Sequence, residues 1–338
     1  MTSSSAGSQP AKLKALLRRP GILVTPAAYD GLSARLVAAA GFEVVAVTGA
    51  GLAASALGVP DLGLMTMTEV VDRIRAIVSA VDVPVIADCE SGFGGPLNVM
   101  RTVRLMENAG VAGYFIEDQT QARRCGHFSG KTVVPVDEMV MRIRAAVKAR
   151  EDPDLMIMAR TDARAVEGLP AALARARAYA EAGADSLFVE APESREEVAE
   201  IADSLRDLGL PLKANMAEGG RTPLMTAGEL EALGYKFAHF PGSCQKVALH
   251  AMSELLTTLR ATGSIADFYP SRMASLDERS ALLDLDGYLQ TESELTDESV
   301  LSQSIPVFGW SSNLRPADYE ETGHAATPDR MVPAAASC

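Results

Sequence analysis

The sequence predicts a (β/α)8 barrel, the α/β fold also called a TIM barrel, followed by a C-terminal helical extension. Three observations predict it. Short apolar runs recur eight times along the chain, helical patterns separate them, and several of these helices end in glycine just before the next run. Eight such units within roughly 230 residues match the usual size of this barrel. A doubly wound open sheet is the alternative, but no glycine-rich nucleotide fingerprint follows the first run.

The apolar runs are continuous rather than alternating, which is typical of strands buried on both faces. Between them, residues 70–78 carry one apolar stripe at helical spacing, and residues 171–182 form an alanine-rich helical segment. Gly41, Gly110 and Gly183 stand where a left-handed residue ends a helix. The predicted strands are 22–25, 44–48, 83–88, 113–117, 155–160, 186–190, 212–215 and 237–240.

Four segments follow from this pattern. We expect an N-terminal tail and short helix at 1–19, and the barrel itself at 20–262. A helical extension is expected at 263–300. Residues 301–338 are polar and rich in proline, alanine and serine, so we expect a flexible tail.

The bulk composition excludes several classes of protein. Of 338 residues, 48% are hydrophobic, which is enough for a large core. A net charge of −13 argues against binding to nucleic acid or to an anionic membrane, because polyanions would be repelled. No apolar run approaches the ~20 residues that span a membrane, and the N-terminus lacks a signal-peptide core. Four cysteines without a CxxC spacing fit the reducing cytoplasm.

Polar and charged residues stand at the carboxyl ends of successive predicted strands. In a barrel these ends converge on one rim, where active sites lie. Charged residues also mark the ordinary passage from strand to loop, but that explains one or two cases better than it explains the whole run of consecutive strands. The residues concerned are Thr48 and Gly49, Asp88 and Glu90, Glu117 and Asp118, Arg160 and Asp162, Glu190, and Asn215.

The acids of this set predict a metal site. They offer hard oxygen ligands without a companion cysteine–histidine pattern, which favours Mg²⁺, with Mn²⁺ also possible; the set is Asp88, Glu90, Glu117 and Glu190. The alternative is a set of salt bridges to neighbouring arginines and lysines. Arg160 is the candidate for clamping a substrate carboxylate, because its guanidinium can donate two parallel hydrogen bonds.

A thiol lies among cations in the segment 123–131. Arg123, Arg124 and Lys131 surround Cys125, and cationic neighbours favour thiolate over thiol. Cys125 is therefore a candidate for moving protons or attacking a substrate. We expect His127 beside it to orient the thiol or lower its pKa. The remaining histidines, His239, His250 and His324, have no supporting pattern and are assigned structural or surface roles.

Over residues 20–290 the chain resembles the isocitrate lyase/phosphoenolpyruvate mutase superfamily. Its small single-domain branch is the most similar, which includes 2,3-dimethylmalate lyase, methylisocitrate lyase and carboxyphosphonoenolpyruvate mutase. Cys125 argues against phosphoenolpyruvate mutase and phosphonopyruvate hydrolase themselves. The resemblance is carried by residues 29–30, 48–51, 57–63, 87–94, 116–119, 125–127, 159–163 and 214–223.

The resemblance implies a Mg²⁺-dependent barrel with a gating loop, here 119–131, that carries the cysteine. It also implies homotetramers, arranged as a dimer of dimers, in which a helical region from 243–290 packs on a neighbouring subunit. The metal residues would be Asp88, Glu90 and Glu117. The catalytic residues would be Cys125, Arg160, His127 and Glu117, and the substrate-binding residues Thr48, Gly49, Ala50, Asp61, Gly126, Arg160, Glu190 and Asn215.

The expected activity is carbon–carbon cleavage of a small 2-hydroxy di- or tricarboxylate, of the 2-alkylmalate, 2,3-dimethylmalate or 2-methylisocitrate type. Alternatives are a phosphonomutase or an oxaloacetate hydrolase on the same scaffold, or a non-catalytic barrel used for binding or assembly. Three departures from the family bear on the substrate. Glu90 replaces the usual Asp, Arg123 replaces the usual Lys, and Ala46 replaces the Tyr of methylisocitrate lyase.

Overall fold

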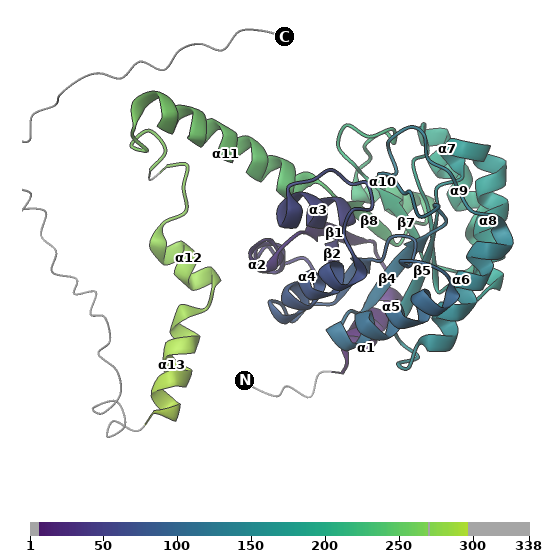
Figure 1. Cartoon of the computed structure of the whole chain (residues 1–338), viewed down its shortest axis with the longest axis horizontal. Coiled ribbons are helices and arrows are strands. Elements are labelled where there is room, and N and C mark those ends of the chain that lie inside the picture. Colours follow the sequence, from purple (N-terminus) through teal and green to yellow (C-terminus); the bar gives the residue numbers. More distant parts are fainter. Residues whose placement is uncertain (1–6, 270, 297–338) are drawn as a thin grey trace, which may run out of the picture. The chain divides into compact units, whose positions relative to one another are not determined.

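The structure, a computed structural model, describes residues 7–269 and 271–296 (Figure 1). By its contacts the chain divides into two units, Met1–Leu285 and Asp286–Cys338. The described part of the second unit lies in helix α13 (Leu285–Leu295). The tail predicted at 301–338 lies outside the described residues, and the other domain limits stay predictions.

Eight parallel strands close into a barrel, in which each strand pairs with the next and β8 pairs with β1. This confirms the predicted fold class. Strands β4, β7 and β8 have the predicted bounds, and the other five differ by one to three residues at an end. The strands are β1 (Leu23–Ala28), β2 (Val45–Val47), β3 (Val85–Asp88), β4 (Gly113–Glu117), β5 (Met156–Thr161), β6 (Ser186–Val189), β7 (Leu212–Asn215) and β8 (Phe237–Phe240).

Helices follow the strands and surround the barrel (Figure 1). Helix α4 shows why the sequence folds this way: Thr66 and Glu69 form a capping box at its start, and the predicted stripe from Val70 to Ile77 is buried. The helices of the barrel region are α1 (Gln9–Arg18), α2 (Gly31–Ala39), α3 (Gly49–Leu57), α4 (Met67–Ser79), α5 (Pro96–Ala109), α6 (Val136–Ala149), α7 (Arg164–Glu167), α8 (Leu169–Glu181), α9 (Arg195–Leu205) and α10 (Ala227–Leu233), with a 3₁₀ turn at Arg206–Leu208.

The barrel interior is filled by apolar side chains, including Phe115, Phe188 and Phe237. Leu13 of α1 belongs to the same buried cluster and is fully buried. The cluster includes the first residues of strands, such as Leu23 and Met156, so the amino-terminal end is packed with apolar side chains. Only the carboxyl ends are therefore left to form a polar site.

Two further helices, α11 (Ser243–Thr262) and α12 (Leu276–Leu282), follow the barrel. Helix α11 has no buried residue, although Val247, Met252 and Leu256 are large apolar side chains that are more than half exposed. Among the helices of the described residues, none has the length and apolar character needed to cross a membrane.

Candidate active site

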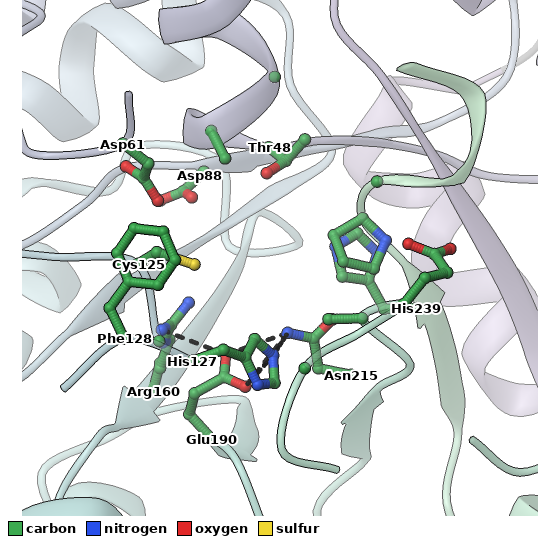
Figure 2. A pocket seen from close by; sticks show the side chains of 18 of the residues that line it. Thr48, Asp61, Asp88, Cys125, His127, Phe128, Arg160, Glu190, Asn215 and His239 are labelled. Atoms are coloured by element: carbon green, nitrogen blue, oxygen red, sulfur yellow. Dashed lines mark hydrogen bonds and ion pairs between the residues drawn. The ribbon is translucent and has the colours of Figure 1, made fainter. Parts of the chain in front are cut away.

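A cavity of about 330 Å³ lies at the carboxyl ends of the strands (Figure 2). Three predicted site residues are not among its lining residues. Gly49 is buried and donates its amide to Asp88, Glu90 lines a neighbouring cavity, and Glu117 is sealed from solvent. The other ten line it: Thr48, Ala50, Asp61, Asp88, Cys125, Gly126, His127, Arg160, Glu190 and Asn215.

Arg160 lines the cavity, and three acids hold its guanidinium, one of them Glu117, whose Oε2 lies 3.4 Å from Nε. Its Nε and Nη2 donate to Asp162 over 2.9 and 3.1 Å, and Nη2 also lies 3.1 Å from Glu190 Oε2. The Nε and Nη2 edge of the guanidinium, which could bind a carboxylate through two parallel hydrogen bonds, is therefore already paired with Asp162. Among the described residues, Nη1 has no such partner, so a bound carboxylate would meet Arg160 through that end.

Asp118 holds the residues that orient Arg160 in place through hydrogen bonds. The sequence placed it among the strand-end acids, but it is fully buried and does not line the cavity. It accepts hydrogen bonds from Thr161 Oγ1 at 2.7 Å, the Asp162 amide at 2.8 Å and Tyr179 Oη at 2.8 Å. These contacts hold the turn after β5, and with it the carboxylate that orients Arg160.

A second cluster of acids surrounds Arg123. Its Nη1 lies 2.6 Å from Asp61 and 3.5 Å from Glu90, and its Nε donates to Glu117 over 2.7 Å. Asp88 accepts from the amides of Gly49 at 3.0 Å and Glu90 at 2.8 Å. For Arg123, the salt bridges considered as the alternative to a metal site are thus formed.

Two of these carboxyl groups have raised pKa values. Burial raises the pKa of Glu90 to about 8 and that of Glu117 to about 7. Arg123 opposes the shift in both cases, and nearby acids reinforce it. Arg160 also opposes the shift of Glu117, so burial outweighs the charge of the nearby guanidinium groups at both carboxyls.

The segment 119–131 folds over Arg160 and is tied down at several points. An antiparallel bridge joins Gln119 to Val133 at its base. The amide of Cys125 donates to the Asp61 carbonyl over 3.2 Å. Lys131 Nζ donates to the Gly126 carbonyl and, over 2.8 Å, to Asp162. The loop thereby places Cys125 at the cavity.

The Cys125 thiol is neutral in this setting. Burial raises its pKa, and a hydrogen bond from the His127 amide only partly offsets this. The prediction that cationic neighbours favour the thiolate is therefore wrong. The physical reason is that those cations have other partners: Arg123 binds the acid cluster, Arg124 donates to the Ser129 carbonyl, and Lys131 binds Asp162. A neutral thiol is suited to donating a proton.

His127 is held in one tautomer by its neighbours. The amide of Arg221 donates to its Nδ1 over 3.1 Å, so the ring proton lies on Nε2, 3.4 Å from Glu190 Oε1. Burial lowers the pKa of His127, which keeps the imidazole neutral. Its amide, rather than its ring charge, is what acts on the Cys125 sulfur.

Gly126 is required by the close approach of the loop to Arg160. A Cβ at this position would lie 2.3 Å from Arg160 Nη2 and 2.6 Å from Glu190 Cγ. We expect Gly126→Ala to push the loop away from the cavity and raise the rate at which a maleimide labels Cys125. Gly228→Ala is the control, because its Cβ would meet nothing within 4 Å. Equal labelling rates in both variants would contradict this closed arrangement.

Comparison with known proteins bears directly on this site. The family described as phosphoenolpyruvate phosphomutase matches residues 13–260. The chain belongs to this family.

Its relatives include proteins named as lyases. A 2,3-dimethylmalate lyase from Eubacterium barkeri is 46% identical over 83% of this chain and 96% of the relative. A probable 2-methylisocitrate lyase from Corynebacterium glutamicum is 42% identical over 88% of this chain and 94% of the relative.

Solved structures of the family are also similar. An oxaloacetate acetylhydrolase in complex with 3,3-difluorooxalacetate has a TM-score of 0.81 and 36% identity, covering 85% of this chain and 97% of its own. A phosphonopyruvate hydrolase in complex with oxalate and Mg²⁺ has a TM-score of 0.77 and 28% identity, covering 86% of this chain and 99% of its own.

The acid cluster of this chain has donors that suit Mg²⁺, the ion present in the phosphonopyruvate hydrolase complex. Glu117 Oε2 is buried and accepts no hydrogen bond, although Arg160 Nε lies 3.4 Å away, so a metal-bound water would supply the donor that it lacks. Within the described residues, no three carboxylate, imidazole or thiolate groups stand ready to hold an ion directly. Mg²⁺ commonly keeps several waters and uses one or two carboxylates, so the donors suit a largely hydrated ion.

Glu90, a departure from the family pattern, has a strained backbone. Its φ is 50°, in the left-handed region that Asp adopts more readily than Glu. We expect Glu90→Asp to keep turnover, or to raise it, while changing the affinity for Mg²⁺ as measured by calorimetry. Loss of turnover would mean that the local backbone has been rebuilt around Glu. Unchanged turnover and affinity together would remove Glu90 from the metal site.

Sequence reasoning missed His239, which lines the cavity. It had been assigned a structural or surface role because no motif accompanies it. Its position near the end of the eighth predicted strand, at 237–240, could have indicated that it lies at the site, because strand ends converge on the rim.

Proposed function

We propose that this chain is a Mg²⁺-dependent carbon–carbon lyase, which cleaves a small 2-hydroxy di- or tricarboxylate to an α-keto acid and a carboxylate. The observation that carries the proposal is the neutral Cys125 thiol at a cavity that also presents Arg160. A thiol can protonate a carbanion, and a guanidinium can hold the charge that develops beside it. The named lyases among its relatives support the same reaction.

In this mechanism Asp88, Glu90 and Glu117 would hold the ion, with Asp88 facing the cavity. When bound, Mg²⁺ supplies Lewis acidity that lowers the pKa of the substrate hydroxyl and stabilises the developing keto acid. Arg160 would hold a substrate carboxylate through Nη1. Cys125 Sγ would deliver its proton to the carbon released by bond cleavage. The loop over Arg160 would exclude water, so that this carbon meets the thiol alone.

Oxaloacetate hydrolysis is the second candidate, because an oxaloacetate acetylhydrolase has one of the similar solved structures. A panel of 2-alkylmalates, 2-methylisocitrate and oxaloacetate, assayed for release of keto acid or oxalate with Mg²⁺, separates the two. We expect α-keto acid from a 2-alkylmalate or from 2-methylisocitrate. Oxalate from oxaloacetate alone would favour the hydrolase, and no product from any of them would favour a non-catalytic barrel.

We also propose a homotetramer, a dimer of dimers, because α11 presents large apolar side chains with no buried residue of its own. Analytical ultracentrifugation should give four times the 35.6 kDa of one chain. A monomer at micromolar concentration would contradict this. The free thiols of Cys89, Cys125 and Cys244 support our further proposal of a cytoplasmic location.

A further inference from the structure

The cavity contains an imidazole that the mechanism above does not use. His239 lies on β8, in register with Thr25 on β1 and with Asn215 on β7. It is only 2% exposed, yet it lines the same cavity as Cys125. Figure 2 places it on the opposite side of the cavity from the Cys125 sulfur.

The hydrogen bonds of His239 determine which ring nitrogen carries the proton. Its Nδ1 lies 3.0 Å from the Thr25 carbonyl, which can only accept, so Nδ1 is the donor. The neutral ring then has its lone pair on Nε2. Burial, with the nearby charge of Lys213, lowers the pKa of His239 and keeps this neutral form at physiological pH. Among the described residues, Nε2 has no hydrogen-bond partner and is not one of the sealed polar atoms.

The neighbouring strand adds a second acceptor. Asn215 Nδ2 donates to both oxygens of Glu190, each over 3.1 Å. This pairing assigns the amide orientation and leaves Asn215 Oδ1 buried without a donor. Two adjacent strands thus present acceptors, His239 Nε2 and Asn215 Oδ1, that lack donors. An ionised 2-hydroxy polycarboxylate has one donor to offer, its hydroxyl group.

We propose that His239 is a catalytic residue, whose Nε2 accepts the hydrogen bond of the substrate's 2-hydroxyl and takes its proton during cleavage. This rests on the lyase function proposed above. As the O–H electrons form the new C=O bond, the C–C electrons pass to the departing carbon, which takes a proton from Cys125 Sγ. Once the products leave and the loop opens, water carries one proton from His239 to the Cys125 thiolate, so atoms and charge balance.

Two substitutions at one position separate the hydrogen bond from the proton transfer. His239→Asn keeps an amide near Nδ1 to serve the Thr25 carbonyl, but removes the group at Nε2. His239→Gln reaches the Nε2 position but cannot take a proton. We expect both to lower kcat by about 100-fold or more, with KM raised mainly in His239→Asn. The control is His250→Asn on α11, an exposed histidine, which should keep wild-type kcat.

Binding gives a readout that does not need turnover. Calorimetry with 2,3-dimethylmalate and its 2-deoxy analogue, 2,3-dimethylsuccinate, should show at least a tenfold preference for the hydroxy acid in the wild type. His239→Asn should lose most of that preference while keeping its circular dichroism spectrum. If His239→Asn keeps the preference for the hydroxy acid, with or without wild-type kcat, His239 does not bind the 2-hydroxyl and the proposal is overturned. If the wild type prefers the hydroxy acid but does not cleave it, the lyase function is refuted instead. Loss of that preference in His239→Asn would then still show whether His239 contacts the 2-hydroxyl.

Discussion

Cys125→Ser is expected to abolish turnover, with kcat falling by about 10²- to 10⁴-fold, the range that a single general acid contributes. A serine hydroxyl is a far weaker acid than a thiol, so it cannot protonate the released carbon at a useful rate. Burial already raises the pKa of Cys125, but the thiol remains the more acidic of the two groups. Steady-state release of the α-keto acid measures the effect.

Cys244→Ser is the matched control, since Cys244 is also a free, partly buried thiol but does not line the cavity. It should keep wild-type kcat. Both variants should retain the wild-type melting temperature and Mg²⁺ affinity. Turnover close to wild type in Cys125→Ser would move the assignment toward a phosphonomutase, a reaction for which the thiol matters less.

Removal of metal is expected to stop the reaction completely. Treatment with EDTA followed by gel filtration should leave no measurable turnover, and Mg²⁺ or Mn²⁺ should restore it, because the acid cluster offers only hard oxygen donors. Full turnover in protein whose metal content is verified as nil would refute the metal dependence. Ca²⁺ is a useful comparison, because its larger size and looser geometry should support less activity.

The metal-free protein should also become less stable as pH rises. Glu90 and Glu117 have folded pKa values of about 8 and about 7, raised above the 4.5 of a free glutamate. The folded state therefore holds these protons more tightly than the unfolded state. The stabilisation of the folded state by these two protonated groups is fully present below about pH 4.5. It is lost as pH rises through 7 to 8.

Urea unfolding at pH 5 and pH 8 measures this change. Mg²⁺ should reduce it, because an ion among the carboxylates makes the ionised form favourable in the folded protein. The same pH dependence with and without Mg²⁺ would argue that the ion does not bind at these residues.

Much of the fold could be predicted because its causes are local. The continuous apolar runs, the stripe from Val70 to Ile77 and the glycines before strands each report on a few neighbouring residues, and all recur in the barrel. Convergence of the strand ends also follows from parallel strands in one closed sheet. That rule alone brought Asp88, Arg160 and Glu190 to one cavity.

The state of each side chain could not be predicted in the same way, because it depends on partners distant in sequence. Arg123 stands two residues before Cys125 along the chain, but in the folded protein it binds Asp61, 62 residues away. The Cys125 pKa is consequently set by burial rather than by the cations beside it in sequence. His239 likewise acquires a defined tautomer only because β8 pairs with β1 and brings the Thr25 carbonyl to its Nδ1. The sequence by itself determined the barrel and the rim where the acids gather; tertiary contacts decided which of those groups are charged, because charge depends on the groups within a few ångströms in space.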